Sequence, residues 1–283
     1  MKTKEEQQQE NDLYAEFLLE DCKINPQEEM DYPPIALSYG SHIYRTIKGE
    51  VEYPTPIATY GNFSFIQAPP KHKKTFLVSL LSAAYLNGET KFSGGLRGHR
   101  GDKCLLHFDT EQGDFDAHKT FKRVAEMCED DSQCYQTFGL RKLSFRERAL
   151  TIDFAIRTTP NLGLVIIDGI ADMISDVNDI NQTNRLMDRV LYWTKEFKCH
   201  IMTVIHTNYD SDKPTGHLGS AMSKKAETQM HLSKSDNNPN VINVSCKSSR
   251  SRAFEDFGFY VNKVGYPQLA DDQFAGEIED FLG

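Results

Sequence analysis

The chain has 283 residues, a formal net charge of −9 and a pI near 5.5. This length suits one α/β domain with appendages better than two full domains. No apolar run approaches the ~18 residues of a membrane-spanning helix, and the first residues lack the apolar core of a secretory signal. We therefore expect a cytoplasmic protein that makes no membrane contact and keeps its thiols reduced.

Acidic residues are concentrated at the two ends of the chain. This distribution divides it into an acidic amino-terminal arm (residues 1–52), a core (residues 53–266) and an acidic tail (residues 267–283). The core carries a slight excess of Lys and Arg, which keeps a nucleic-acid partner compatible with the low pI. The acidic ends either shield a basic groove, dock on a neighbouring subunit or only keep the protein soluble.

The predicted elements start with a helix over residues 2–23 and a Pro-rich linker over 24–37. Short extended pieces over 38–60 lead into the core. Buried-strand patterns then alternate with amphipathic helix patterns, which favours a parallel sheet covered on both faces. The strands are expected over 63–68, 103–109, 161–168, 199–206 and 241–246, and the helices over 75–87, 114–127, 145–157 and 183–197.

The turn that follows the strand at 63–68 has the layout of a phosphate-binding loop, G-x-x-x-x-G-K-[ST]. Lys74 and Thr75 fill the last two places, whereas Ala68 and Lys73 stand where the pattern has glycines. A lysine with left-handed backbone costs on the order of 1–2 kcal/mol. Alone, the segment is equally a strand-to-helix turn with a chance Lys-Thr pair. The residues expected to contact phosphate are Ala68, Pro69, Pro70, Lys71, His72, Lys73, Lys74 and Thr75.

Polar residues follow three more of the predicted strands. The strand at 103–109 leads into Asp109 and Glu111, the next ends in Asp168, and the one after that ends in His206. Ligands of parallel α/β sheets bind at the carboxyl ends of the strands. We therefore expect these side chains to converge with Lys74 on one site.

These motifs resemble the RecA-like P-loop ATPases, and within them the RepA/DnaB-type hexameric helicases and related AAA-family ATPases of mobile elements. Segments 216–227 and 244–252 add to the resemblance, which covers residues 53–266. It implies an α/β fold with a mostly parallel central sheet flanked by helices.

The resemblance also implies ATP and Mg²⁺ as cofactors. Lys74 would neutralise the β- and γ-phosphates, and Thr75 and Asp168 would hold Mg²⁺. Glu111 would be the general base for the attacking water, and His206 would sense the γ-phosphate.

Three cations near residue 250 would act on a neighbouring subunit. Lys247, Arg250 or Arg252 would serve as a finger that stabilises transition-state charge across a subunit boundary. The implied assembly is a ring, a hexamer in the helicase branch.

The implied partner is single-stranded DNA, in the replication or mobilisation of a plasmid or mobile element. The loop at 170–183 has acidic residues and no Lys or Arg, so DNA contact would fall to Lys213, Lys224 and Lys225. The alternatives are that these lysines are plain surface residues, and that the protein is a non-catalytic nucleotide-sensing or DNA-binding regulator or scaffold on the same fold.

Overall fold

The architecture comes from a computed structural model that describes residues 2–46, 49–88, 95–128, 134–208, 211–236 and 238–270. Residues 271–283 of the expected acidic tail therefore lie outside the described residues. The chain divides into two units, Met1–Pro33 and Pro34–Gly283. The boundary expected after residue 52 falls inside a strand of the second unit.

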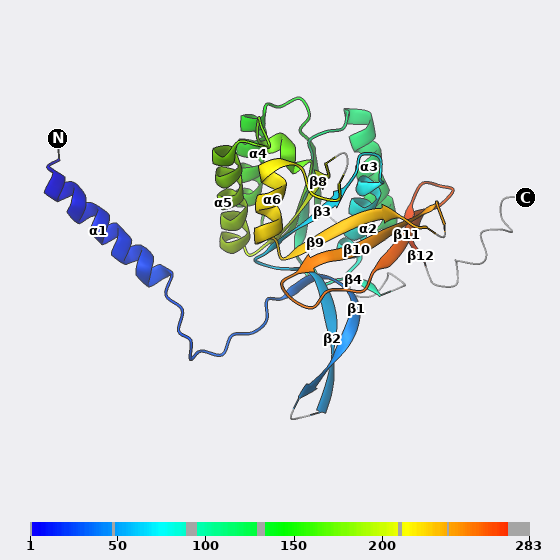
Figure 1. Ribbon diagram of the computed structural model, residues 1–283, viewed down its shortest axis with the longest axis horizontal. Helices are drawn as coiled ribbons and strands as arrows, with labels where there is room; N and C mark the ends of the chain where they lie inside the picture. The colour runs from blue at the N-terminus through cyan, green and yellow to red at the C-terminus, as the bar shows by residue number, and fades with distance from the viewer. Residues whose placement is uncertain are drawn as a thin grey trace, which may run out of the picture. The chain divides into compact units, whose positions relative to one another are not determined.

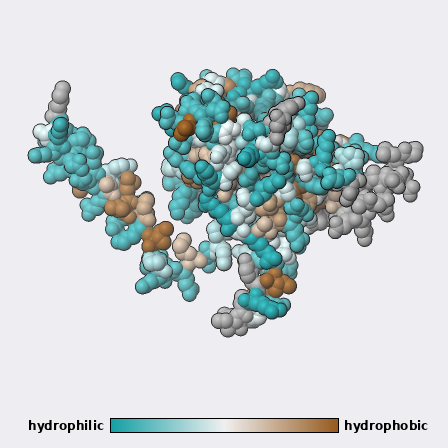
Figure 2. All heavy atoms as spheres, viewed as in Figure 1, coloured by the Kyte–Doolittle hydropathy of each residue, from teal (hydrophilic) through white to brown (hydrophobic). Residues whose placement is uncertain are grey.

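The first unit holds helix α1 (Lys4–Asp21), as expected. The helix begins with a capping box, in which the Thr3 hydroxyl accepts the Glu6 N–H and the Glu6 carboxylate accepts the Thr3 N–H. None of its residues is buried. Leu13 and Phe17 are among its exposed apolar side chains. Figure 2 shows brown patches along this helix.

The second unit is built on a sheet with the order β12-β11-β10-β9-β3-β8-β7-β5-β6 (Figure 1). The strands from β9 to β6 in this order run parallel, and β10, β11 and β12 are antiparallel. This confirms the predicted mostly parallel central sheet. The bounds are β3 (Phe63–Ala68), β5 (Cys104–Asp109), β6 (Tyr135–Gly139), β7 (Leu162–Asp168), β8 (His200–His206), β9 (Thr228–Lys234), β10 (Val241–Ser249), β11 (Phe257–Val261) and β12 (Pro267–Ala270).

Helices cover both faces of this sheet (Figure 1). One face carries α2 (Lys74–Asn87) and α3 (Asp114–Met127). The other carries α4 (Phe145–Thr158), α5 (Ile180–Glu196), α6 (Gly216–Lys225) and the short 3₁₀ helix η2 (Ile170–Met173). Side chains of β7 alternate between the two layers, so that Ile166 packs on the α2 side and Ile167 on the α5 side.

A smaller sheet with the order β2-β1-β4 packs against α2. It consists of β1 (Ile35–Thr46), β2 (Gly49–Thr59) and β4 (Leu96–Gly98). The short extended pieces expected over 38–60 are therefore the long strands of one hairpin. The residues of the hairpin nearest the main sheet are buried, whereas Ile43 and Val51 farther along it are exposed. Within the described ranges, every helix is too short or too polar to span a bilayer.

Candidate functional site

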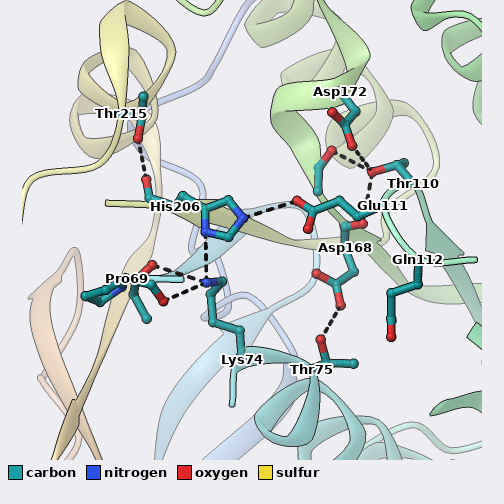
Figure 3. A network of polar contacts seen from close by, with 12 residues as sticks. Pro69, Lys74, Thr75, Thr110, Glu111, Gln112, Asp168, Asp172, His206 and Thr215 are labelled. Atoms are coloured by element: carbon teal, nitrogen blue, oxygen red, sulfur yellow. Dashed lines mark hydrogen bonds and ion pairs between the residues drawn. The ribbon is translucent and has the colours of Figure 1, made fainter. Parts of the chain in front are cut away.

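The carboxyl ends of β3, β8, β7 and β5 meet at one edge of the sheet. The strand register pairs Ala68 with His206 and Asp109 with Asp168. The structure therefore brings the polar strand ends singled out in the sequence together with the start of α2 (Figure 3).

The loop from Ala68 to Thr75 bends sharply just before α2. Lys73 has φ +55° and ψ +28°, which is left-handed backbone, and Lys71 also has a positive φ of +65°. Lys73 thus adopts the conformation that glycine provides in the phosphate-loop pattern, at a cost of about 1–2 kcal/mol. The amino terminus of α2 follows this loop directly, and a helix amino terminus favours an anion.

The Lys74 side chain is folded into the site and is only 8% exposed. Its ammonium donates to the carbonyl oxygens of Ala68 (3.2 Å) and Pro69 (3.0 Å) and to Nδ1 of His206 (3.0 Å; Figure 3). Burial lowers the Lys74 pKa, and the nearby acids Glu111 and Asp168 act in the opposite direction.

His206 links Lys74 to Glu111. Because an ammonium can only donate, Nδ1 of His206 must accept from it, which leaves the ring proton on Nε2. Nε2 lies 3.4 Å from Oε1 of Glu111. The hydrogen bond from His206 holds the pKa of the Glu111 carboxyl below its usual range. The His206 carbonyl accepts both the N–H (3.0 Å) and the hydroxyl (2.8 Å) of Thr215.

Thr75 and Asp168 place two side-chain oxygens next to each other beside this chain of contacts. The Thr75 hydroxyl donates to Oδ2 of Asp168 at 3.3 Å. Burial, with the charges of Asp109 and Glu111 nearby, raises the Asp168 pKa to about 7. A cation would relieve this accumulation of negative charge. Mg²⁺ usually takes one or two protein ligands and completes its shell with water and phosphate oxygens, so a hydroxyl and a carboxylate fit it.

Larger metal sites are not assembled among the residues that the structure describes. No group of three or more His, Cys, Asp or Glu side chains there could hold a metal ion. The ligand pair of Thr75 and Asp168 therefore suits an ion that arrives with phosphate.

Sequence reasoning missed the role of Thr110 and Gly169 in shaping the site. The Thr110 hydroxyl lies within hydrogen-bonding distance of the Asp168 carbonyl (3.0 Å), the Gly169 carbonyl (2.9 Å) and Oδ2 of Asp172 (2.9 Å). Gly169 has φ +107°, and a Cβ there would lie 2.3 Å from the Thr110 hydroxyl oxygen. The positions of Thr110, between Asp109 and Glu111, and of Gly169, directly after Asp168, were the available signals.

The three candidate finger residues lie outside this network. The Lys247 ammonium is 3.5 Å from Oδ2 of Asp212. The Arg250 guanidinium donates to the Lys225 carbonyl at 2.7 Å, and the backbone N–H of Arg250 donates to the Glu227 carbonyl. The Glu227 N–H in turn donates to the carbonyl of Phe63, the first residue of β3, so Arg250 lies at the edge opposite Lys74.

Arg252 is in the same region as Arg250. Burial lowers the pKa of His42 in β1, and the charge of Arg252 lowers it further. Within the described part of the chain, the hydrogen bonds and ion pairs of Arg250 involve residues outside the phosphate loop.

The candidate DNA-binding lysines are split between the two ends of α6. Lys213 is exposed just before the helix, near His206, whereas Lys224 and Lys225 are its last residues. Lys225 lies 3.8 Å from Asp188 of α5. The structure thus leaves Lys213 apart from the other two.

A recess of about 450 Å³ opens beside the start of α2. Phe76, the residue after Thr75, forms one wall, and the Arg123 guanidinium lies over its ring at 4.1 Å. Tyr266, the α3 lysines Lys119 and Lys122, and part of the segment 263–265 also line it. A larger recess of about 1140 Å³ lies between α4 and α5, but none of the phosphate-loop residues lines it.

The sheet order and this edge define a RecA-like nucleotide-binding domain. The model of the AAA domain family matches residues 56–212, more than half of the chain, and the chain belongs to that family. No curated protein matches the sequence.

Solved structures agree on the fold. The crystal structure of the RadB recombinase is similar to this chain, with a TM-score of 0.53 and 14% sequence identity. The match covers 77% of this chain and 94% of the RadB chain. The ATPase domain of G40P is similar with a TM-score of 0.50 and 15% sequence identity. That match covers 71% of this chain and 82% of the G40P chain. At these identities the likeness shows the RecA-like fold alone.

Proposed function

We propose that this protein binds ATP with Mg²⁺ and hydrolyses it. The observation that carries the proposal is the continuous set of contacts from Lys74 through His206 to Glu111, beside the Thr75–Asp168 pair. Lys74 and Thr75 begin α2, Asp168 and His206 end β7 and β8, and Glu111 follows β5, so the arrangement is a product of the fold and not of local sequence.

The phosphates would lie at the amino terminus of α2, in the loop from Ala68 to Thr75. There they would replace the carbonyl oxygens of Ala68 and Pro69 as partners of the Lys74 ammonium. Thr75 and Asp168 would hold Mg²⁺, which supplies charge neutralisation to the phosphate oxygens. The recess at Phe76 would receive the nucleoside, whose base can stack on aromatic rings and guanidinium groups.

Hydrolysis would use Glu111 as the base. Its carboxylate takes a proton from water while the water oxygen bonds the γ-phosphorus, and the bond from that phosphorus to the bridging oxygen breaks, releasing ADP. His206 donates to Glu111 and accepts from Lys74, so it is placed to report the state of the phosphates to the base. Its carbonyl bonds to Thr215 extend this to the segment before α6.

We place the protein in the RepA/DnaB-type branch, as a hexameric ring acting on single-stranded DNA of a replicating or mobile element. Arg250 lies out of reach of its own Lys74, as a residue that acts on a neighbour must. The RecA-like fold that it shares with a recombinase and an ATPase domain is compatible with this assignment. Lys213, Lys224 and Lys225 are the proposed DNA contacts.

The test is the steady-state ATPase rate of Glu111→Gln beside wild type. We expect the rate to fall by about 10²-fold or more while nucleotide affinity is kept, because only the base is lost. Glu255→Gln, the same change at an exposed position, should keep the wild-type rate. A wild-type rate no higher than that of Glu111→Gln, with nucleotide still bound, would instead assign a nucleotide-sensing regulator.

A further inference from the structure

A second polar cluster lies beside the phosphate loop and has no part in the proposed hydrolysis. Its centre is the Asp212 carboxylate, which lies 3.5 Å from Nε2 of His231 through one oxygen and 3.5 Å from the Lys247 ammonium through the other. His231 belongs to β9 and Lys247 to β10, so the two donors come from neighbouring strands of the sheet.

One of the two donors, His231, contacts a buried amide network. Gln67 of β3 is 1% exposed and donates to the Asp212 carbonyl at 2.8 Å. Its amide nitrogen is also 3.5 Å from Nδ1 of His231, so Nδ1 accepts and the ring proton lies on Nε2, directed at Asp212. Gln229 donates to the Gln67 carbonyl oxygen at 3.0 Å and fixes the amide orientation.

The Asp212 carboxylate fits these donors poorly. Both contacts are 3.5 Å long, whereas charge-assisted hydrogen bonds are typically about 2.7–2.9 Å. Its side chain is 67% exposed and that of Lys247 is 43% exposed, so water screens the ion pair and its strength is small. The His231 side chain is nearly buried, at 6% exposure, and Asp212 does not give it a short hydrogen bond.

We infer that Lys247 and His231 form a phosphate-binding site that Asp212 occupies as an internal substitute. A phosphate group has more oxygens and more negative charge than a carboxylate, so it can reach both donors at shorter distances. Asp212 is next to Lys213 in the segment that returns to His206 through Thr215. Displacing the Asp212 carboxylate would therefore leave Lys213 and Lys247 available to contact phosphates of the same nucleic-acid strand.

The inference rests on the proposed function in one respect: the phosphates are taken to be those of single-stranded DNA. The test measures binding of a labelled oligo-dT by fluorescence anisotropy to wild type, Asp212→Asn and Asp236→Asn. Asp236 is exposed, so its variant makes the same change of net charge away from the cluster.

We expect Asp212→Asn to bind roughly three- to tenfold more tightly than wild type, and the salt dependence to steepen by about 0.7, the value for one added phosphate contact on a single strand. Asp236→Asn should stay near wild type. The double variant Asp212→Asn/Lys247→Gln should lose the gain. Equal affinity of Asp212→Asn and Asp236→Asn, or a gain that survives in the double variant, overturns the inference while the proposed DNA contact stands.

A second arm separates the source of the phosphate. Inorganic pyrophosphate is added in the Lys74→Ala background, which removes the lysine of the phosphate loop, and Tm is recorded. One outcome is that pyrophosphate raises Tm when Asp212→Asn is added to this background but not when Asp212 is kept. If, in addition, neither protein binds oligo-dT, the phosphate site is supported and DNA is rejected as its ligand. No response of Asp212→Asn to either probe, in folded protein, overturns the inference.

Discussion

Nζ of Lys74 lies 3.0 Å from Nδ1 of His206, across the boundary between the start of α2 and the end of β8. The same ring lies 3.4 Å from Glu111, so one imidazole separates the candidate phosphate-binding lysine from the candidate base. A phosphate that draws Lys74 away frees the His206 acceptor and changes the hydrogen bond that holds the Glu111 pKa low. In the proposed mechanism, phosphate binding and the base are therefore coupled through the His206 side chain.

Lys73→Gly should stabilise the protein. Glycine removes the left-handed cost of about 1–2 kcal/mol. It also adds unfolded-state freedom worth about 0.4–1 kcal/mol, so the net gain is on the order of 0.5–1 kcal/mol in the free energy of unfolding. Lys73→Ala loses the same charge but keeps the strained backbone, so it isolates the conformational part. Urea denaturation compares the two, and equal midpoints would refute the assignment of strain at φ +55°.

Gly169→Ala should destabilise the protein by about 2–4 kcal/mol, because left-handed strain adds to a clash with the Thr110 hydroxyl. Gly265 is a matched control: it has φ +91°, and a Cβ added there would meet nothing within 4 Å, so Gly265→Ala bears the strain alone. The difference in Tm between the variants measures the clash. Similar losses in both would show that Thr110 yields without cost.

Asp168→Asn should change the pH dependence of stability. The Asp168 pKa is raised to about 7 in the fold, so the native state keeps a proton that the unfolded chain releases. Without Mg²⁺ and nucleotide, the wild type therefore loses stability as pH rises from about 4 to about 7. The Tm advantage of Asp168→Asn should grow between pH 5 and pH 8 by the equivalent of roughly 2 kcal/mol. Parallel Tm curves, with Asp236→Asn as control, would contradict the raised pKa.

Arg250→Ala should impair hydrolysis in a neighbour and not in its own site. Mixing Arg250→Ala with Glu111→Gln places an intact base beside an intact arginine at some subunit boundaries, so the mixture should regain ATPase activity that neither variant has alone. The measurement is the ATPase rate of the mixture after subunit exchange, plotted against the ratio of the two variants. A mixture that stays as inactive as its components would rule out a shared site.

Much of the site edge could be predicted because its signals are local. Continuous apolar runs ending in Asp168 or His206 place the ends of strands, and the helix expected over 114–127 has the bounds of α3. The predicted strand at 241–246 continues to Ser249. Strand β9 was not predicted, because Thr228 and His231 are polar residues buried by neighbouring strands, and its pattern lacks an apolar run.

The remaining features depend on contacts between distant residues. The left-handed backbone of Lys73 is imposed by the fold against the preference of lysine. The Asp212–Lys247 pair joins residues of separate elements that no spacing rule connects. The placement of Arg250 at the far edge likewise follows from the register of β10 on β9.

The central claim is that the altered loop still binds a nucleotide through Lys74. Isothermal titration of wild type and Lys74→Ala with a slowly hydrolysed ATP analogue and Mg²⁺ tests it most directly. We expect micromolar binding by wild type, on the order of −8 kcal/mol, and its loss in the variant. No heat of binding by folded wild type, or equal binding by Lys74→Ala, would contradict it.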